Sequence, residues 1–403
     1  MASWLHTARA RHPQRIAIET PERSVSYADL AELADVAAAG LSAGQRVPLA
    51  IADRLGFAVA LHGCLLAGAA AVPIDLRLSE AERAARERSG LATHGEDVAT
   101  VMHTSGTTSA PKPVELTHAN WQANALGSAV MLGLDPGERW LCVMPLAHVG
   151  GLSILVRSAI YATTVVAHER FETAAVLDEL MDPGRAITLV SLVPTMLARL
   201  LDAGLERPPT LRWALLGGGP IPAPLLARAE AAGVPIAPTY GMTEACSQIA
   251  THGFPLPGVE LRTVDGELWV RGPIVAPGSL GEDGWLHTGD LAELDGSGRL
   301  TIVGRKSDTI VSGGENVAPA EVESVLLEHP AVADAGVFAR PDPEWGEAVV
   351  ARVVLRDEAR ASAEELRDWC GTRLARFKVP KQVEFGTELP RTASGKLLRR
   401  QLQ

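Results

Sequence analysis

Cysteine is scarce in this chain of 403 residues, and it forms no recognisable metal or disulfide pattern. The four cysteines, Cys64, Cys142, Cys246 and Cys370, lie far apart, make no C-x-x-C pair and have no histidine at zinc-ligand spacing. We therefore expect reduced thiols, as is usual for a cytoplasmic protein, and no zinc site.

Long apolar runs are missing as well, and positive charge is not in excess. No apolar run reaches the roughly 18 residues of a membrane-spanning helix, and residues 1–6 do not read as a signal peptide. The net charge of −11 disfavours non-specific nucleic-acid binding, although a local basic pocket is still allowed. We expect a cytoplasmic protein with no stable membrane anchor and no nucleic-acid partner.

Length and a regular alternation of strands and helices are what the chain does have. At 403 residues, 47% of them hydrophobic, it is too long for one ordinary core. From residue 27 to 216 short apolar strands alternate with helices, one of which is predicted over 58–70. This alternation is typical of a parallel sheet covered by helices. Strands in hairpins, separated by Gly/Asp-rich turns, follow after about residue 255.

The C-terminal part, residues 319–403, reads as a separate α+β unit with a predicted helix over 363–374. A short polar bridge at 304–308 precedes it. The predicted fold is therefore α/β: a large domain, residues 1–306, with parallel-sheet layers covered by helices plus a β-rich subdomain, and a small α+β domain, residues 307–403.

The most informative segment is 102–118, a strand, a turn rich in Ser, Thr and Gly, and the start of a helix near Thr117 and His118. Such a turn combines backbone N–H groups, hydroxyl donors and the cation of Lys112, which are the parts of a polyphosphate cradle. It is not a Walker A loop, because the G-x-x-x-x-G-K-[ST] spacing is absent. The alternative is a surface turn rich in Ser and Thr.

Two further segments suit a nucleotide. Gly217, Gly218 and Gly219 follow a strand and let a flat ring approach the backbone, although a tight strand-to-helix turn explains them equally well. Residues 239–245 combine an aromatic, a hydroxyl and a carboxylate in one short turn. Tyr240 could stack on a base, Thr243 could bind a phosphate oxygen, and Glu244 could hold Mg²⁺, which prefers one or two carboxylates plus ligand phosphates.

Sugar recognition is predicted at Asp290, placed at the end of a strand-like stretch, because two carboxylate oxygens match a vicinal diol. Arg305, in the polar bridge, could add donors to the same sugar. Lys396 lies in a glycine turn near the C-terminus, where an isolated lysine is usually only solvated.

In this order, the segments TSGTTSAPKPVELTH, YGMTEACSQ, GWLHTGDLAELDGSGRLTIVGRKSD and PRTASGKLLRR resemble the adenylate-forming superfamily of acyl-CoA synthetases, amino-acid-adenylating domains and beetle luciferase. The matches run from residue 102 to 400. Ser109 and Pro113 stand where that family usually has glycine, and the first 100 residues are shorter than its usual lead-in.

The resemblance implies two half-reactions that need ATP, Mg²⁺ and coenzyme A. A carboxylate first attacks the α-phosphate of ATP, and a thiol then displaces AMP. The small domain, carrying Lys396, would rotate between these steps about Ser307. Lys396 would bridge acyl and phosphate oxygens, with Thr243 and Glu244 as further catalytic residues and Glu244 as the metal ligand. The other cofactor-binding residues that the resemblance implies are Thr104, Ser105, Gly106, Thr107, Thr108, Lys112, Gly217, Gly218, Gly219, Tyr240, Gly241, Met242, Asp290, Arg305, Gly313, Gly314 and Glu315.

Residues 144–161 bear on the acid, and together with 215–222 and 240–248 they look like the o-succinylbenzoate–CoA ligases of menaquinone biosynthesis. That acid keeps one carboxylate charged, and Arg157 could pair with it bidentately. His148 could orient the reacting carboxylate, and Ser247 and Gln248 could edge the pocket. The alternatives are a helix-capping or acid-paired Arg157 and a core histidine at His148.

Other functions stay open at this point. The chain could be another aryl- or acyl-CoA synthetase, or a non-catalytic nucleotide-binding regulator, although Lys396, Glu244 and Asp290 argue for catalysis. The expected partners are a small carboxylic acid, ATP and coenzyme A, and a homodimer is compatible with the sequence.

Overall fold

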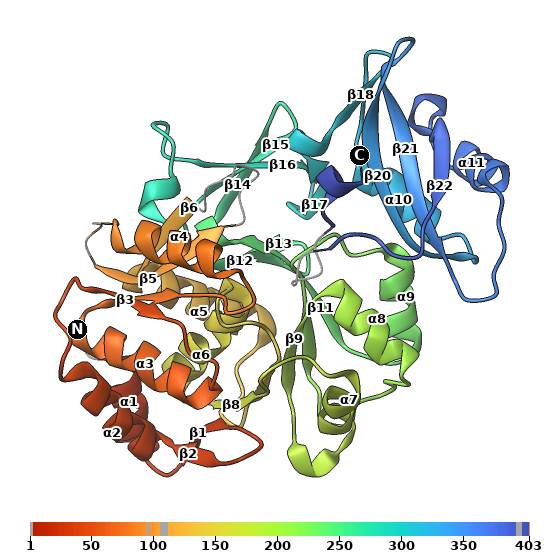
Figure 1. The fold of residues 1–403 in the computed structure, drawn as a ribbon. Coiled ribbons are helices and arrows are strands. Elements are labelled where there is room, and N and C mark those ends of the chain that lie inside the picture. Colours follow the sequence, from red (N-terminus) through yellow and green to blue (C-terminus); the bar gives the residue numbers. More distant parts are fainter. Residues whose placement is uncertain (1–2, 94, 96, 105–111, 392–396, 403) are drawn as a thin grey trace.

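The computed structural model describes residues 3–93, 95, 97–104, 112–391 and 397–402, and four β-sheets organise them (Figure 1). Within these residues, no helix has both the length and the apolar character that crossing a membrane requires. The predicted α/β class is confirmed, since the largest sheet is mainly parallel and carries helices on its faces.

The largest sheet has nine strands, and five of its neighbouring pairs are parallel. In spatial order they are β13 (Phe254–Pro255), β12 (Ser247–Thr251), β11 (Ile236–Met242), β10 (Trp213–Leu216), β9 (Leu189–Leu192), β7 (Arg139–Cys142), β8 (Thr164–Ala167), β1 (Ile16–Glu19) and β2 (Ser24–Ser26).

Alternate residues of the central strands face two different cores. Trp140 and Cys142 of β7 pack in one hydrophobic cluster together with five helices. Leu141, which lies between them in the sequence, packs in a second cluster together with three other helices. This is the period-two alternation of a strand buried on both faces. The helices of the first group are α1 (Trp4–Arg11), α2 (Tyr27–Ala38), α3 (Arg54–Ala67), α5 (His118–Leu132) and α6 (Val149–Tyr161), and those of the second are α7 (Thr173–Met181), α8 (Pro194–Asp202) and α9 (Ala223–Ala231).

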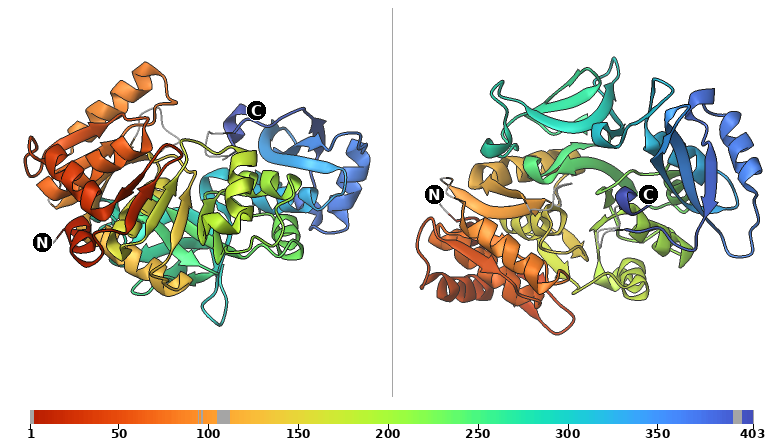
Figure 2. Two further views of the ribbon diagram at one scale, coloured as in Figure 1. Left: turned by 90° about the horizontal axis from the view of Figure 1, so that it is seen from below. Right: turned by 45° about the horizontal axis from the view of Figure 1, so that its top comes forward.

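Two four-stranded sheets flank this body (Figure 2). One is parallel except for its last pair and is accompanied by α4 (Glu80–Leu91); its strands are β3 (Arg46–Leu49), β4 (Ala70–Pro73), β5 (Val98–Thr104) and β6 (Lys112–Thr117). The other is an antiparallel meander, as the hairpin pattern predicts, with strands β14 (Glu260–Val264), β15 (Glu267–Arg271), β16 (Leu286–Leu294) and β17 (Leu300–Arg305).

The C-terminal sheet has a hydrophobic cluster of its own, which contains Val337, Val349 and Leu366. It stands to one side of the larger body in Figure 1. Its strands are β18 (Ile310–Ser312), β19 (Glu315–Val317), β20 (Val332–Asp342), β21 (Gly346–Leu355) and β22 (Gln382–Phe385), and its helices are α10 (Pro319–Leu327) and α11 (Ala363–Gly371). Short 3₁₀ turns are η1 (Pro183–Arg185), η2 (Thr243–Ala245), η3 (Pro277–Ser279), η4 (Lys306–Asp308), η5 (Arg376–Lys378) and η6 (Arg399–Gln401).

Local capping explains where the helices begin. The helix expected over 58–70 starts at Arg54, because the Asp53 side chain accepts hydrogen bonds from two backbone N–H groups, and it ends before Gly68, whose φ is +68°. The predicted start of α5 is confirmed: Thr117 caps it in a reciprocal pair with Asn120. Helix α11 ends at Gly371, three residues before the predicted Leu374, since Gly and Thr372 are weak helix formers.

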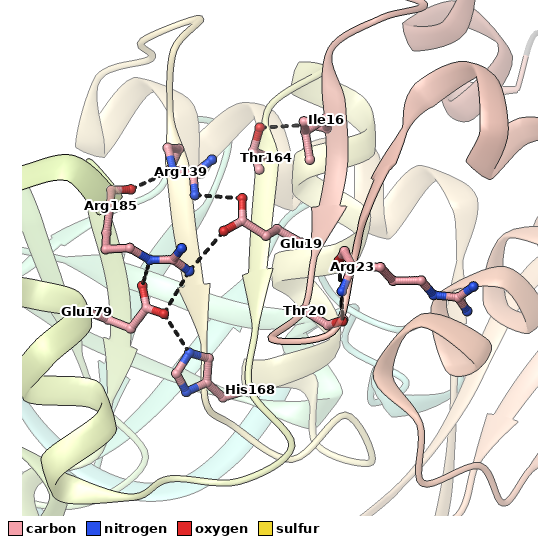
Figure 3. A network of polar contacts seen from close by, with 9 residues as sticks. All are labelled: Ile16, Glu19, Thr20, Arg23, Arg139, Thr164, His168, Glu179 and Arg185. Atoms are coloured by element: carbon pink, nitrogen blue, oxygen red, sulfur yellow. Dashed lines mark hydrogen bonds and ion pairs between the residues drawn. The ribbon is translucent and has the colours of Figure 1, made fainter.

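An ionic network ties β1 to β7 and α7 (Figure 3). Glu19 accepts from Arg139 and pairs with Arg185, both at 2.9 Å. Arg185 also donates to Glu179 at 2.7 Å, and His168 lies 3.1 Å from the same carboxylate. These contacts connect the end of β1 to β7, two positions away in the largest sheet, and to helix α7.

Candidate active site

Asp290 lies at the centre of a three-residue polar cluster formed by β11, β16 and β17. Its side chain is only 6% exposed. The Tyr240 hydroxyl donates to Oδ2 at 2.6 Å, and Arg305 Nε lies 2.8 Å from Oδ1. Burial, and then the charge of Asp290, raise the pKa of Tyr240, so this phenol stays protonated and keeps donating.

The position of Asp290 differs from the predicted one. It lies in the middle of β16 rather than at its end, directly opposite Arg305 in the antiparallel ladder. The hairpin register therefore brings carboxylate and guanidinium together, which their separation of fifteen sequence positions does not reveal.

Thr243 and Glu244 follow β11 and lie in the turn η2. A strained reversal of the backbone connects this turn to β12. Cys246 and Ser247 have φ of +54° and +95°, unusual values that cost free energy for residues other than glycine. A Cβ on Gly241 would lie 1.6 Å from the Ser247 carbonyl oxygen, so glycine is required there. Glu244 is half-buried; its backbone carbonyl accepts from the Ala276 N–H at 2.8 Å, while its carboxylate has no hydrogen-bonding or ionic partner among the described residues.

The three-glycine turn lies beside this hairpin. Gly217 directly follows β10 and lies next to Thr239, and a Cβ on it would meet the Thr239 carbonyl oxygen at 2.8 Å. Gly218 has φ of +82°, while Gly219 has open space around it. These three residues therefore form a tight turn that requires glycine, and they also leave space for a flat ring to approach the backbone.

The predicted phosphate cradle is described only at its two ends. Thr104 ends β5 and pairs with Lys112, which begins β6 with an exposed side chain. Both strands contact η2, the turn that contains Thr243 and Glu244. Pro113 pairs with His103 in the same ladder. The predicted residues Ser105, Gly106, Thr107 and Thr108, and the unusual Ser109, lie outside the described residues.

His148 is found at the N-cap of α6 with its side chain 39% exposed, which is not the environment of a core histidine. Arg77 Nη2 lies 3.3 Å from its Nε2, and Asp75 lies 3.7 Å away while pairing with Arg77 at 2.6 Å. Burial lowers the pKa of His148, and the nearby Asp75 opposes that shift. Asp75 and Arg77 belong to the chain after β4 and carried no sequence signal as site residues.

Arg157 occupies the interior of α6 and is 1% exposed. It does not cap the helix, since Ala162 does, and no acid among the described residues pairs with it. Its Nη2 donates to Asn124 Oδ1 at 2.5 Å, and the Trp140 ring centroid lies 5.6 Å from Cζ. Gln248, 2% exposed, is joined to this group because Asn124 donates to its carbonyl oxygen.

The remaining predicted residues lie elsewhere. Gly313 and Gly314, with φ of +61° and +84°, and Glu315 form the tip of the β18–β19 hairpin, where Gly313 packs against Trp345. No hydrogen bond or ion pair between described residues joins this tip to β11 or β16. Met242 ends β11 opposite Ser247, whereas Lys396 lies outside the described residues.

Metal binding by protein ligands alone is not indicated. Within the described ranges, no group of three or more His, Cys, Asp or Glu side chains could hold an ion. An unpaired, half-buried Glu244 beside the ends of a phosphate cradle does fit Mg²⁺ held mainly by ligand phosphates.

Sequence and structural comparisons agree along the whole chain. The profile of the AMP-binding enzyme family matches residues 5–93 and 85–280, and that of the AMP-binding enzyme C-terminal domain matches residues 321–396. The chain is 37% identical over 476 aligned residues to 2-succinylbenzoate–CoA ligase of Bacillus subtilis (strain 168), covering 100% of this chain and 97% of the relative. The ligase of Bacillus cereus (strain ATCC 14579) is 36% identical, with coverage of 100% and 98%.

Two solved structures give the same result at the level of the fold. The o-succinylbenzoate CoA synthetase (MenE) of Bacillus subtilis, in complex with its acyl-adenylate intermediate, has a TM-score of 0.91 at 37% identity, covering 100% of this chain and 98% of that one. ATP-bound MatB from Rhodopseudomonas palustris has a TM-score of 0.90 at 25% identity, again covering 100% and 98%.

Proposed function

Because the chain belongs to the AMP-binding enzyme family, we propose that it is an ATP-dependent acid–CoA ligase that converts 2-succinylbenzoate to 2-succinylbenzoyl-CoA through an acyl-adenylate. The observation that carries the proposal is the end-to-end likeness, at a TM-score of 0.91, to a synthetase solved with that intermediate. The sequence resemblance to acyl-CoA synthetases led to the same activity.

The nucleotide would be held where the described residues converge. The Asp290 carboxylate accepts ribose hydroxyls while Tyr240 and Arg305 hold it in place. The ring face of Tyr240 and the turn of Gly217 to Gly219 border the adenine. Gly241 and Met242 position Tyr240 for this contact, because they follow it directly in the tight reversal between β11 and β12.

Charge must be neutralised before a carboxylate attacks the α-phosphate, because the acid and the triphosphate repel each other. Lys112, Thr104 and the predicted cradle residues 105–108 donate to the β- and γ-phosphates, and Thr243 donates to a phosphate oxygen. Glu244 is the ligand for Mg²⁺, which when bound offsets phosphate charge. Lys396 bridges acyl and phosphate oxygens, as the family resemblance implies.

The acid would lie between α6 and β12. His148 orients the carboxylate that reacts, and Ser247 and Gln248 edge the pocket. Arg157 pairs with the carboxylate that is not activated. A buried guanidinium with no acidic partner supports this last assignment, since an unpaired buried charge is costly unless an anion joins it.

The small domain, residues 307–403, would rotate about Ser307 between the two half-reactions. Ser307 lies in the 3₁₀ turn η4, whose neighbour Asp308 pairs with Arg399 at 2.8 Å. The tip formed by Gly313, Gly314 and Glu315 would then line the tunnel that admits the thiol of coenzyme A. Its two glycines would let the backbone approach this thiol closely.

We also retain two expectations about the cellular state of the protein. A cytoplasmic location is supported by four cysteines that are all free and buried. Association into a homodimer remains a proposal.

A pyrophosphate-release screen tests the proposed function. Purified protein with ATP and Mg²⁺ is offered aryl, dicarboxylic and fatty acids, with and without coenzyme A. We expect release with 2-succinylbenzoate well above the panel and formation of its thioester only when coenzyme A is present. A different acid as the best substrate, or no acid-dependent release, would contradict the proposal.

A further inference from the structure

We propose that Asn124 is a positioning residue that holds the Arg157 guanidinium through a neutral acceptor and thereby keeps its positive charge available to the second carboxylate of the acid. This inference rests on the proposed function and deepens it. Asn124 lies on α5, is fully buried and carried no motif in the sequence.

Asn124 uses both ends of its amide. Its Oδ1 accepts from Arg157 Nη2 at 2.5 Å, and its Nδ2 donates to the Gln248 carbonyl oxygen at 2.9 Å. One side chain thus fixes α6 relative to β12. These two elements carry Arg157 and Gln248, both predicted to contact the acid, so the amide holds the two residues at a fixed separation and fixes the direction of the cation.

The surroundings of Arg157 leave its charge uncompensated. Its Nε is buried and has no hydrogen-bonding partner within the described part of the chain, and the guanidinium also lies against the Trp140 ring. Tyr161 and Cys246 lie close enough to influence it, yet burial raises the pKa of Tyr161 to about 12 and that of Cys246 well above its ordinary value. Both therefore remain neutral at physiological pH.

A second buried arginine shows that this arrangement is specific to Arg157. Arg54 is 6% exposed and donates from both terminal nitrogens, to the carbonyl oxygens of Met144 and Glu169. Among the residues that the structure describes, Arg157 makes one hydrogen bond and keeps further donors available in a buried environment, where an arriving carboxylate would be strongly attracted.

The amide is the informative feature, because an aspartate of the same shape would neutralise Arg157 internally. We therefore expect Asn124→Asp to raise KM for 2-succinylbenzoate about tenfold or more, the loss typical of a charge-assisted hydrogen bond. KM for the monocarboxylic analogue, which lacks the carboxylate that is not activated, should stay within about twofold of wild type. The measurement is steady-state pyrophosphate release with both acids.

Asn120→Asp is the matched control. Asn120 is a buried asparagine one turn earlier on α5 that also donates to backbone carbonyl oxygens, those of Pro273 and Val275. It is expected to lose thermal stability with an unchanged ratio of the two KM values. If Asn124→Asp does not fold, Asn124→Leu replaces it, since removing the acceptor also frees the guanidinium from its position and raises the same ratio.

An unchanged ratio of the two KM values in the folded Asn124 variant would overturn the inference. An equal loss with both acids gives this result. That result is distinguishable from failure of the proposed function, which wild-type protein alone reveals: if it does not release pyrophosphate with 2-succinylbenzoate, both proposals are wrong.

Discussion

The Tyr240 hydroxyl donates a hydrogen bond of 2.6 Å to Oδ2 of Asp290, whose other oxygen is held by Arg305. A carboxylate bound on both sides is fixed in orientation before any ligand arrives. Asp290 can still accept further hydrogen bonds, because each carboxylate oxygen has two lone pairs. The pair thus joins β11, which precedes the Thr243–Glu244 turn, to β16.

Tyr240→Phe tests this relationship, because it keeps the aromatic ring and removes only the donor. We expect KM for ATP to rise about tenfold, the lower end of the cost of losing a hydrogen bond to a charged group. KM for the acid should change little. Tyr27→Phe is the control: its hydroxyl donates to the carbonyl oxygens of Ser158 and Thr163, so it should lose stability without affecting KM for ATP.

Arg157→Leu tests the anchor for the second carboxylate. We expect KM to rise much more for the dicarboxylic acid than for its monocarboxylic analogue, by about tenfold or more. Arg54→Leu removes another buried guanidinium, which donates to the backbone carbonyls of Met144 and Glu169, and it should leave the selectivity unchanged. Equal changes for the two acids in Arg157→Leu would remove this residue from the pocket.

Lys396→Ala separates the two half-reactions. Pyrophosphate release should be nearly abolished, whereas thioester formation from supplied acyl-adenylate and coenzyme A should persist, because in the proposed mechanism the lysine bridges charge only while the adenylate forms. Lys378→Ala, which breaks an ion pair with Glu321 at 2.7 Å in the same domain, is the control and should affect neither step strongly. Equal loss of both half-reactions in Lys396→Ala would refute the two-state assignment.

Glu179 makes stability depend on pH. Burial raises the pKa of this carboxyl, but hydrogen bonds from His168 and Arg185 outweigh it and lower the pKa to about 2. A depressed pKa in the folded state means that the stabilisation is present above the ordinary pKa of Glu and is lost as the pH falls from about 4.5 towards 2. Its full size is about 3 kcal/mol, since each pKa unit corresponds to about 1.4 kcal/mol.

Glu179→Gln should therefore destabilise the protein at pH 7 and progressively less as the pH is lowered. Urea unfolding of both proteins between pH 7 and 3 measures the difference between their free energies of unfolding. Taking this difference cancels the acid sensitivity of groups that both proteins share, such as the buried His62, because burial lowers the pKa of His62 to about 4. A difference that does not depend on pH would show that the carboxylate charge contributes nothing.

Sequence alone determined the features that depend on neighbouring residues. The start of α5 follows from Thr117 and Asn120, the three-glycine turn from its composition, and the alternating strands and helices from their period. The order of four motifs was enough to identify the family, since each motif is a short, locally constrained segment that keeps its residues together.

Only the tertiary structure decided how distant segments meet. The register of β16 and β17 places Asp290 opposite Arg305, and the packing of α5 against α6 and β12 brings Asn124 to Arg157. Asp75 and Arg77 reach His148 in the same way. Periodicity assigns a residue to a buried face but not to a partner, because the partner depends on helix crossing and strand register, which are set by packing of the whole core.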